Sequence, residues 1–418
     1  MNGKTKLVAL ALLAMPLLQA CDTSAAWEGT ITDSAGVAIV TNTNTPLWRG
    51  DDAWTVTEDL RIGTVAGEPE YQFGQLAFLA VGDDGTIYVP DMQAQEIKVF
   101  DAQGTYVRTI GGPGGGPGEL GQGAAFVLVA PNGELMVPDL GNRRVNRYGP
   151  DGEPVGSFSL SIEAGVPTLW AMDASGRLMA QLRGLNIPGM AALEEGDPIV
   201  VYDTTGMVVD TVALLPKGQM LAGMSEQQFA MTIFAPEPVW DLGSDGSIYY
   251  AMNDQFRVLV NDPQGNLVRI IRKDMPRKPV EESDQNAILR LLREQWETAG
   301  VPPAQIEQLM TGVGFAETYP AFGRFFIGPE ETLWVQGIRS ARDMAEAAGE
   351  EEVEFNPQDI GSPQWQVFDN QGRYLGIVEF PDGFQPVTFK SGHIYGIWTD
   401  ELDVQYVMRL QVNLPADG

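Results

Sequence analysis

Residues able to carry out acid–base, nucleophilic or metal chemistry are unevenly supplied in this sequence. Its 418 residues include one histidine, His393, and one cysteine, Cys21. A Ser-His-Asp triad needs a histidine beside its nucleophile, and most zinc sites need several histidine or cysteine ligands. We therefore expect neither a histidine cluster nor a cysteine-based zinc site. Enzymatic activity stays open, but the sequence favours a role without catalysis.

Oxygen ligands are abundant, because Asp and Glu together number 56. Ca²⁺ is held by about six to eight oxygens, and Asp91, Asp139, Asn142 and Asp241 are possible ligands. Calcium is thus a possible cofactor, although the sequence requires none. Asp91 and Asp139 follow equivalent short apolar runs, which favours a structural role in which each carboxylate caps the next turn.

Two other polar residues, Asp241 and Arg324, interrupt stretches that are otherwise apolar. Each is expected to cap a turn or to bond a backbone amide, unless it belongs to a binding site. The candidate ligand-binding residues are Asp91, Asp139, Asn142, Arg143, Asp241 and Arg324.

The elements that position these residues are short strands in a repeating order. Residues 83–120 contain three apolar runs, IYV, IKVF and YVRTI, separated by turn signals, and residues 132–160 repeat the pattern, including its Val-Pro-Asp. Such runs predict an antiparallel meander. About four strands per roughly 40–45 residues is the period of a propeller blade.

Six turns, each followed at once by an apolar strand, set the number of blades at six. The turns are Asp84-Gly85, Asn132-Gly133, Ser175-Gly176, Asp245-Gly246, Glu330-Glu331 and Ser391-Gly392. The sixth unit lacks a fourth strand of its own, so we expect Trp54–Thr64 to pair with Asp403–Val412 and close the ring. The predicted fold class is all-β, a six-bladed β-propeller with a helical insertion.

The insertion is expected at about residues 273–312. Ser283 or Asp284 could cap a helix that runs to Thr298, and a shorter helix over Pro303–Met310 could follow. A further short helix is predicted over Ser225–Phe234. The acidic run Ala345–Glu354 is expected to be a solvated loop.

The N-terminus has the pattern of an export signal. Two lysines precede an uncharged apolar run that ends before Cys21, and this run is too short for a finished transmembrane helix. Leu18-Gln19-Ala20-Cys21 resembles the lipobox of bacterial lipoproteins, which implies lipidation of Cys21; an ordinary secretory signal cleaved near Ala20 is the alternative. We predict a signal peptide over residues 1–20, a tether and hairpin over 21–52, and the propeller over 53–414.

The formal net charge is −30, from 26 Lys and Arg against 56 Asp and Glu. Such a surface repels nucleic acid, and we expect no nucleic-acid partner. Contact with the membrane is expected through the lipid anchor only. The predicted location is the cell envelope, as a membrane-anchored lipoprotein that is periplasmic or surface-exposed.

The first repeat resembles an NHL-type repeat, in which a glycine turn precedes Ile-Tyr-Val-Ala-Asp, a polar loop, Arg-Ile-x-Val-Phe and Asp-x-x-Gly. The second repeat keeps Asp139, Asn142 and Arg144-Val145 of that pattern. The whole chain is similar to secreted or lipid-anchored bacterial six-bladed propellers that have no agreed activity. The resemblance therefore implies the fold more than a function.

Two functions remain open on the sequence. The first is a binding or scaffold module for a protein, peptide or glycan of the cell envelope. The second is a calcium-dependent hydrolase of the lactonase type. An enzyme of that type should gather several carboxylates at one mouth of the propeller, whereas a binding module could present aromatic and basic groups there.

Overall fold

The computed structural model describes residues 27–184, 193, 195–225, 228–348 and 360–415. Cys21 and the predicted signal peptide therefore lie outside the described residues. Within these ranges, no helix is both long and apolar enough to cross a membrane.

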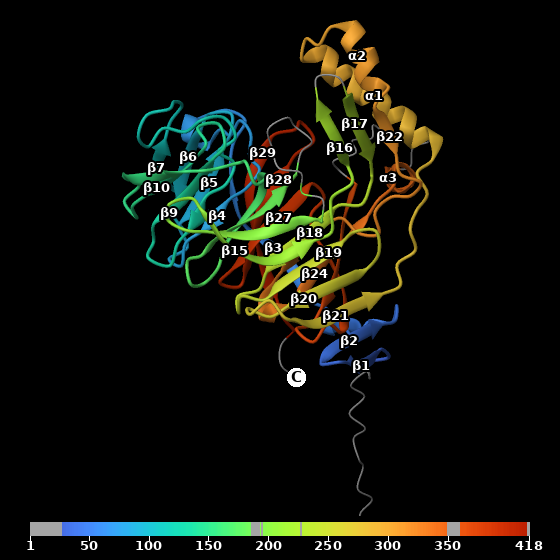
Figure 1. The fold of residues 1–418 in the computed structure, drawn as a ribbon. Coiled ribbons are helices and arrows are strands. Elements are labelled where there is room, and N and C mark those ends of the chain that lie inside the picture. The colour runs from blue at the N-terminus through green and yellow to red at the C-terminus, as the bar shows by residue number, and fades with distance from the viewer. Residues whose placement is uncertain (1–26, 185–192, 194, 226–227, 349–359, 416–418) are drawn as a thin grey trace, which may run out of the picture.

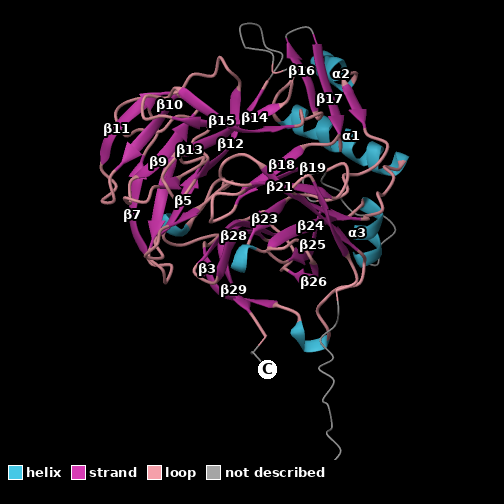
Figure 2. Cartoon of the chain, turned by 60° about the horizontal axis from the view of Figure 1, so that its bottom comes forward, coloured by secondary structure: helices cyan, strands magenta, loops and turns pink. Residues whose placement is uncertain are grey.

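The described strands form six antiparallel blades around one axis, which confirms the predicted fold class (Figures 1 and 2). Each blade has four strands of its ring, in the order innermost to outermost. They are β4 (Ala80–Val81), β5 (Ile87–Asp91), β6 (Glu96–Phe100) and β7 (Tyr106–Gly111); β8 (Leu128–Val129), β9 (Leu135–Asp139), β10 (Arg144–Tyr148) and β11 (Pro154–Ser159); β12 (Val166–Met172), β13 (Leu178–Arg183), β14 (Asp197–Tyr202) and β15 (Val208–Leu215); β18 (Pro238–Leu242), β19 (Ile248–Met252), β20 (Arg257–Asn261) and β21 (Leu267–Lys273); β23 (Phe325–Ile327), β24 (Leu333–Ile338), β25 (Gly361–Phe368) and β26 (Tyr374–Glu379); and β27 (Phe384–Lys390), β28 (His393–Thr399), β29 (Gln405–Asn413) and β3 (Thr55–Ile62).

Local sequence explains these strands and their turns. All five residues of β5 are buried, because neighbouring blades cover both faces of the sheet. The Asp-x-x-Gly turns recur for a physical reason that Asp101 illustrates. Its carboxylate accepts hydrogen bonds from the backbone N–H groups of Gln103 and Thr105, at 2.9 and 2.8 Å. Gly104 has a φ of 81°, which a residue with a Cβ rarely adopts.

The ring closes as the sequence predicted. β3 pairs antiparallel with β29, with Val56 opposite Val412 and Ile62 opposite Val407. Between blades the contacts are apolar, and the junction of blades five and six is the most aromatic, with Trp334, Trp365 and Phe380 in one cluster. This burial stabilises the ring without a disulfide.

The predicted N-terminal hairpin is present as β1 (Thr30–Ser34) and β2 (Val37–Asn42). The sequence did not indicate where it would attach. β2 pairs in parallel with β21 on the outside of blade four, giving that sheet six strands. Asn42 fixes the junction, because its side chain bonds atoms of both blade four and blade five.

Three segments are inserted between strands of the ring: one between β15 and β18, one between β21 and β23, and one between β24 and β25. The elements α1, α2, β16 and β17 of the first two project together from the ring (Figure 1). The predicted helix pair is confirmed as α1 (Glu282–Thr298) and α2 (Pro303–Met310). The predicted cap is wrong by two or three residues. Glu281 is the N-cap, and Asp284 completes a capping box with it.

The helix predicted over Ser225–Phe234 is wrong, because the segment is mostly extended. β16 (Leu221–Ser225) and β17 (Gln228–Ile233) are paired with each other, and β17 also pairs in parallel with β22 (Val313–Phe315). These long-range partners override a weak local preference. The start of the acidic run belongs to α3 (Ala341–Ala348), and the rest of that run lies outside the described residues. Short 3₁₀ turns complete the described elements, at Gly50–Asp52, Pro69–Tyr71 and Pro329–Glu331.

Candidate functional site

Asp91 holds the loops at one end of blade one. It is only 2% exposed, and its carboxylate accepts four backbone hydrogen bonds. The donors are the N–H groups of Gly74, Gln75, Gln93 and Ala94, at 2.8 to 3.1 Å. The oxygens of Asp91 are therefore satisfied within the protein.

Asp139 occupies the matching place in blade two and is also satisfied. It accepts hydrogen bonds from the backbone of Gly121 and from both the backbone and the side-chain amide of Asn142. A weaker contact of 3.3 Å comes from Asn146. Arg143 is exposed and takes a left-handed φ of 51° in the same turn. The predicted ligand roles of these residues stay predictions, but their geometry accounts for them as loop supports.

Strand register places Arg324 in a ring of six side chains around the propeller axis. Leu169 pairs with Gln181 and Val239 with Ala251, each three strand pairs before the last pair of the inner two strands. Gln385 pairs with Ile397, three strand pairs before the equivalent pair of Phe389 and Ile394. Arg324 lies at the same level, because its carbonyl accepts a hydrogen bond from the Gln336 N–H. In blades one and two, the residues three positions before Val81 and Val129 are Phe78 and Phe126, and they lie at the same level. The axial ring consists of Phe78, Phe126, Leu169, Val239, Arg324 and Gln385.

Arg324 is the one charged member of the axial ring. Burial lowers the pKa of its guanidinium to about 10. Among the described residues its side chain has one hydrogen bond, from Nη2 to Oε1 of Gln385 at 3.2 Å, and no carboxylate within ion-pair distance. Arg324 is partly exposed to solvent, and a cation at a propeller axis without an anion beside it is a candidate for a functional site.

The opposite side of the axial ring is aromatic. The rings of Phe78 and Phe126 are in contact, with centroids 4.9 Å apart. Their blades are neighbours, and the inner strands β23, β27, β4 and β8 follow one another around the axis. The ring therefore offers a guanidinium and an amide on one side and an apolar surface on the other.

Asp241 lies one layer below the axial ring, two residues after Val239 on the same strand face. Its carboxylate accepts hydrogen bonds from the backbone of Ile327 in the next blade, at 2.7 Å, and of Leu242, at 2.8 Å. Burial raises the pKa of Asp241 to about 6 despite these bonds. Its contacts match the expected backbone-bonding role, and it links the inner strands of blades four and five.

A buried charge network between blades three and four was not expected from the sequence. Asp197 is 1% exposed, and one of its oxygens lies 3.3 Å from Nε of Arg183. Arg183 also forms an ion pair of 2.5 Å with Glu237. These residues come from two strands and a loop that meet only in the folded protein, so their spacing in the sequence does not predict that they form ion pairs.

Metal chemistry finds no support in the part of the chain that the structure describes. No group of three or more His, Cys, Asp or Glu side chains lies close enough to hold an ion. His393 is paired with Asp59, 3.3 Å away. The arrangement at the axis is suited to binding, with a cation and aromatic groups where a calcium hydrolase would need converging carboxylates.

Comparisons with known proteins agree with this fold. Residues 70–172 match the model of the DUF5128 family, described as a 6-bladed beta-propeller. A protein from Bacteroides fragilis that is presumed to be exported has a TM-score of 0.52 at 10% identity, over 90% of this chain and 99% of its own. A duf4221-family protein from Bacteroides vulgatus has a TM-score of 0.54 at 12% identity, over 87% and 100%.

Virginiamycin B lyase from Staphylococcus aureus also matches, with a TM-score of 0.43 at 13% identity over 86% of this chain and 99% of its own. No curated protein sequence matches the chain. The predicted resemblance to bacterial six-bladed propellers is thus confirmed, by the family model over residues 70–172 and by the fold over most of the chain.

Proposed function

We propose that this protein is a lipid-anchored binding module outside the cytoplasm, whose axial ring receives an acidic group of a protein, peptide or glycan in the cell envelope. Cys21 would carry the lipid. The likeness to a protein presumed to be exported is in line with that location. The observation that carries the proposal is Arg324, a partly buried guanidinium at the axis without a carboxylate partner among the described residues.

Physical chemistry relates this guanidinium to an acidic ligand. A guanidinium binds a carboxylate through two parallel hydrogen bonds, and such bonds are strong where water is scarce. Within the described part of the chain, Arg324 bonds only a neutral amide, that of Gln385, so most of its donors are available to a ligand. Phe78 and Phe126 would pack against an apolar part of the same ligand.

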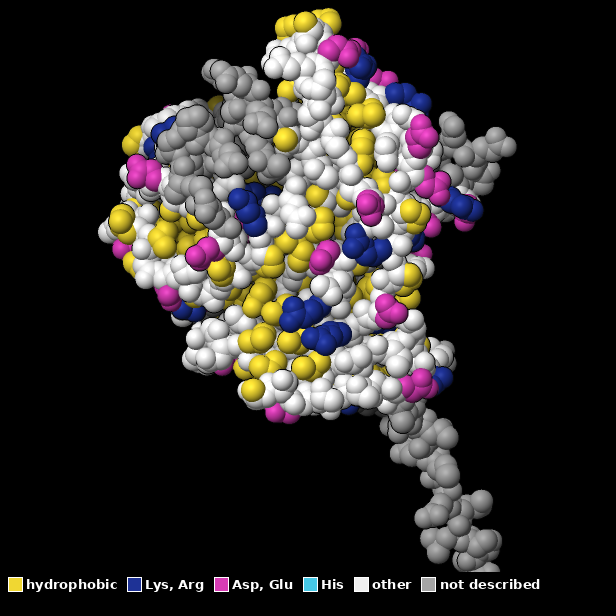
Figure 3. Space-filling model, turned by 45° about the vertical axis from the view of Figure 1, so that its right-hand side comes forward, with side chains coloured by type: hydrophobic (Ala, Val, Ile, Leu, Met, Phe, Trp, Pro, Cys, Tyr) yellow, Lys and Arg dark blue, Asp and Glu magenta, His cyan; other side chains and the backbone are white. Residues whose placement is uncertain are grey.

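The surface charge favours recognition by shape over attraction at long range. The net charge of −30 repels an acidic ligand until it reaches Arg324. On the face shown in Figure 3, basic side chains are scattered in small groups rather than gathered in one large patch. Added salt should therefore raise the association rate of an acidic ligand, because it screens the overall repulsion.

A hydrolase of the lactonase type is the alternative, and it would require several free carboxylates at the axis. Among the described carboxylates discussed above, Asp241 lies there, and its oxygens already accept hydrogen bonds from the N–H groups of Leu242 and Ile327. Asp91 and Asp139 are engaged in their loops. The geometry therefore supports binding better than this reaction.

The test uses peptides that differ only at the C-terminus. Short peptides ending in Phe or Leu, each made as the free acid and as the amide, are titrated against the purified protein by fluorescence anisotropy. Methyl glycosides of uronic acids and their neutral counterparts form a second arm. We expect acids to bind better than neutral partners, and Arg324→Met to weaken the acids by about tenfold or more.

Arg290→Met is the matched control, because Arg290 is exposed on α1 and away from the axis. Equal binding by the Arg324 variant and the wild type would refute the role of the axial ring. Turnover of lactones or esters that requires calcium would replace the proposal with the hydrolase.

A further inference from the structure

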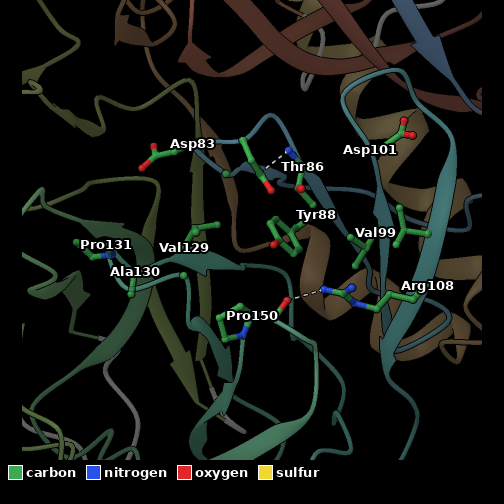
Figure 4. A pocket seen from close by; sticks show the side chains of 14 residues that line it. Asp83, Thr86, Tyr88, Val99, Asp101, Arg108, Val129, Ala130, Pro131 and Pro150 are labelled. Atoms are coloured by element: carbon green, nitrogen blue, oxygen red, sulfur yellow. Dashed lines mark hydrogen bonds between the residues drawn. The ribbon is translucent and has the colours of Figure 1, made fainter.

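A cavity of about 370 Å³ lies between blades one and two, away from the axial ring. Its walls come from the turn after β4, from β7 and from the turn after β8 (Figure 4). This volume is at the low end of the range of ligand pockets, roughly 300–1,000 Å³. A small ligand, or one unit of a longer one, would fill it.

Tyr88 is the central polar group of this cavity. It lies in the middle of Figure 4, between the turn at Thr86 and the hydrogen bond that joins Arg108 to Pro150. The side chain is 7% exposed, and its hydroxyl has no hydrogen-bond partner in the described part of the chain. Burial raises the pKa of Tyr88, so the hydroxyl keeps its proton and can donate. The hydroxyl oxygen is not fully enclosed by protein, so it can bond a ligand in the cavity.

Arg108 supplies further free donors. Nη2 donates to the carbonyl of Pro150 at 2.7 Å, which holds the guanidinium against the cavity wall. Nε is buried without an acceptor, and no carboxylate of the described residues lies within ion-pair distance. Asp84 supplies an acceptor, because its two oxygens offer about four lone-pair sites, whereas Thr86 occupies only some of them with its backbone N–H and its hydroxyl.

The charges that line the cavity disfavour a strongly charged ligand. Asp84 and Asp101 would repel an anion, whereas Arg108 would repel a cation. The remaining carboxylate, Asp83, is paired with Lys390 at 2.5 Å. A neutral ligand with many hydroxyl groups could use the free donors and the free acceptor together.

The rest of the wall is apolar. Val99, Val107, Val129, Pro131 and Pro150 line it, and Val107 is 49% exposed, so its side chain is open to a ligand. A pyranose ring combines hydroxyls on its edge with a C–H face that packs on such side chains. We propose that this cavity binds one neutral sugar unit, with Tyr88 and Arg108 donating to its hydroxyls and Asp84 accepting from them.

The junction of blades four and five provides an internal comparison. Tyr249 and Arg269 occupy the places of Tyr88 and Arg108, and Arg269 likewise donates to a carbonyl of the next blade, that of Asn370. There the next turn carries Glu331 at the position of Gly133. The Glu331 carboxylate lies 3.2 Å from the Ser244 N–H and bonds the Ser244 hydroxyl. Because Gly133 has no side chain, the cavity between blades one and two stays open.

The test is calorimetry and saturation-transfer NMR with methyl glycosides of glucose, galactose, mannose and N-acetylglucosamine, and with glucuronic acid and glucosamine as charged counterparts. At least one neutral glycoside should bind with one site per chain and better than its charged counterpart. Tyr88→Phe should weaken it about three- to tenfold, which corresponds to one hydrogen bond. Tyr249→Phe is the matched control and should bind as the wild type does.

Asp84→Asn provides a second variant with a conserved shape and should also weaken the neutral glycoside. Arg324→Met should leave the affinity for the neutral glycoside unchanged, so this test is independent of the test at the axial ring. The proposal is overturned if no neutral glycoside binds at millimolar concentrations, or if Tyr88→Phe and Tyr249→Phe have equal effects on the bound one. Thermal melting of each variant separates lost binding from lost folding.

Discussion

Replacement of Asn42 by alanine should weaken the attachment of the N-terminal hairpin and lower the stability of the whole propeller. The side chain is 5% exposed and makes four hydrogen bonds. Its amide nitrogen donates to the carbonyls of Gly372, at 2.9 Å, and Arg272, at 3.3 Å. Its oxygen accepts from the Tyr374 N–H, at 2.7 Å, and from the indole of Trp27, at 3.0 Å.

Two of these partners decide the magnitude. The bonds to Gly372 and Tyr374 are fully buried, so alanine leaves one carbonyl and one N–H without a partner and without water. Each such group costs about 1–3 kcal/mol, which gives a loss of about 2–6 kcal/mol in the free energy of unfolding. The bonds to Arg272 and Trp27 are partly accessible, and water can replace them at lower cost.

Urea unfolding followed by tryptophan fluorescence measures this loss. Asn44→Ala is the control, since Asn44 is exposed two residues further on and makes no described hydrogen bond. Hydrogen exchange should show faster exchange in β2 and β21 and no change in β5. A loss below about 1 kcal/mol, or one equal to that of the control, would refute the reasoning.

The remaining predictions concern the anchor, the closure and the axis. Cys21→Ser should leave folding intact and move the protein to the aqueous phase in a detergent partition assay; retention in the detergent phase would contradict the lipid anchor. Deletion of residues 21–64 removes the partner of β29, so the melting temperature should fall for the whole ring, and an unchanged value would contradict this. The pKa of Asp241 is raised from 3.8 to about 6 by burial, so the folded state keeps this proton to higher pH than the unfolded state does. Its contribution to stability therefore falls as pH rises from about 4 to about 6, and Asp241→Asn should lose that slope in urea midpoints measured across this range; an identical slope would count against it.

Local signals in the sequence predicted most of the ring. The Asp-x-x-Gly turns and short apolar runs depend on neighbouring residues, and so do the boundaries of α1 and α2. The partner of β2 could not be predicted, because it lies about 230 residues away and its choice depends on packing. For the same reason the sequence predicts a helix over Ser225–Phe234, whereas the segment pairs with β22, some 80 residues later.

The candidate sites were predictable in part. Arg324 and Asp241 stood out as polar residues in apolar strands, but only strand register showed that Arg324 shares a ring with Phe78 and Phe126. Tyr88 gave no signal, because in the run Ile87-Tyr88-Val89 it resembles any core residue of a strand. Its free hydroxyl becomes evident only when Arg108 and the next blade are placed beside it.

The pairing of β3 with β29 also has a consequence for the order in which the protein can be made. β3 is among the first strands to leave the ribosome, and its partner comes some 350 residues later. β2 likewise waits for β21. Neither the first strands nor the last blade can reach their final pairing until nearly the whole polypeptide has emerged, and contacts between such distant residues form slowly. Under the location proposed above, the chain would cross a membrane unfolded, and this delay would keep the early strands unpaired until the crossing was almost complete.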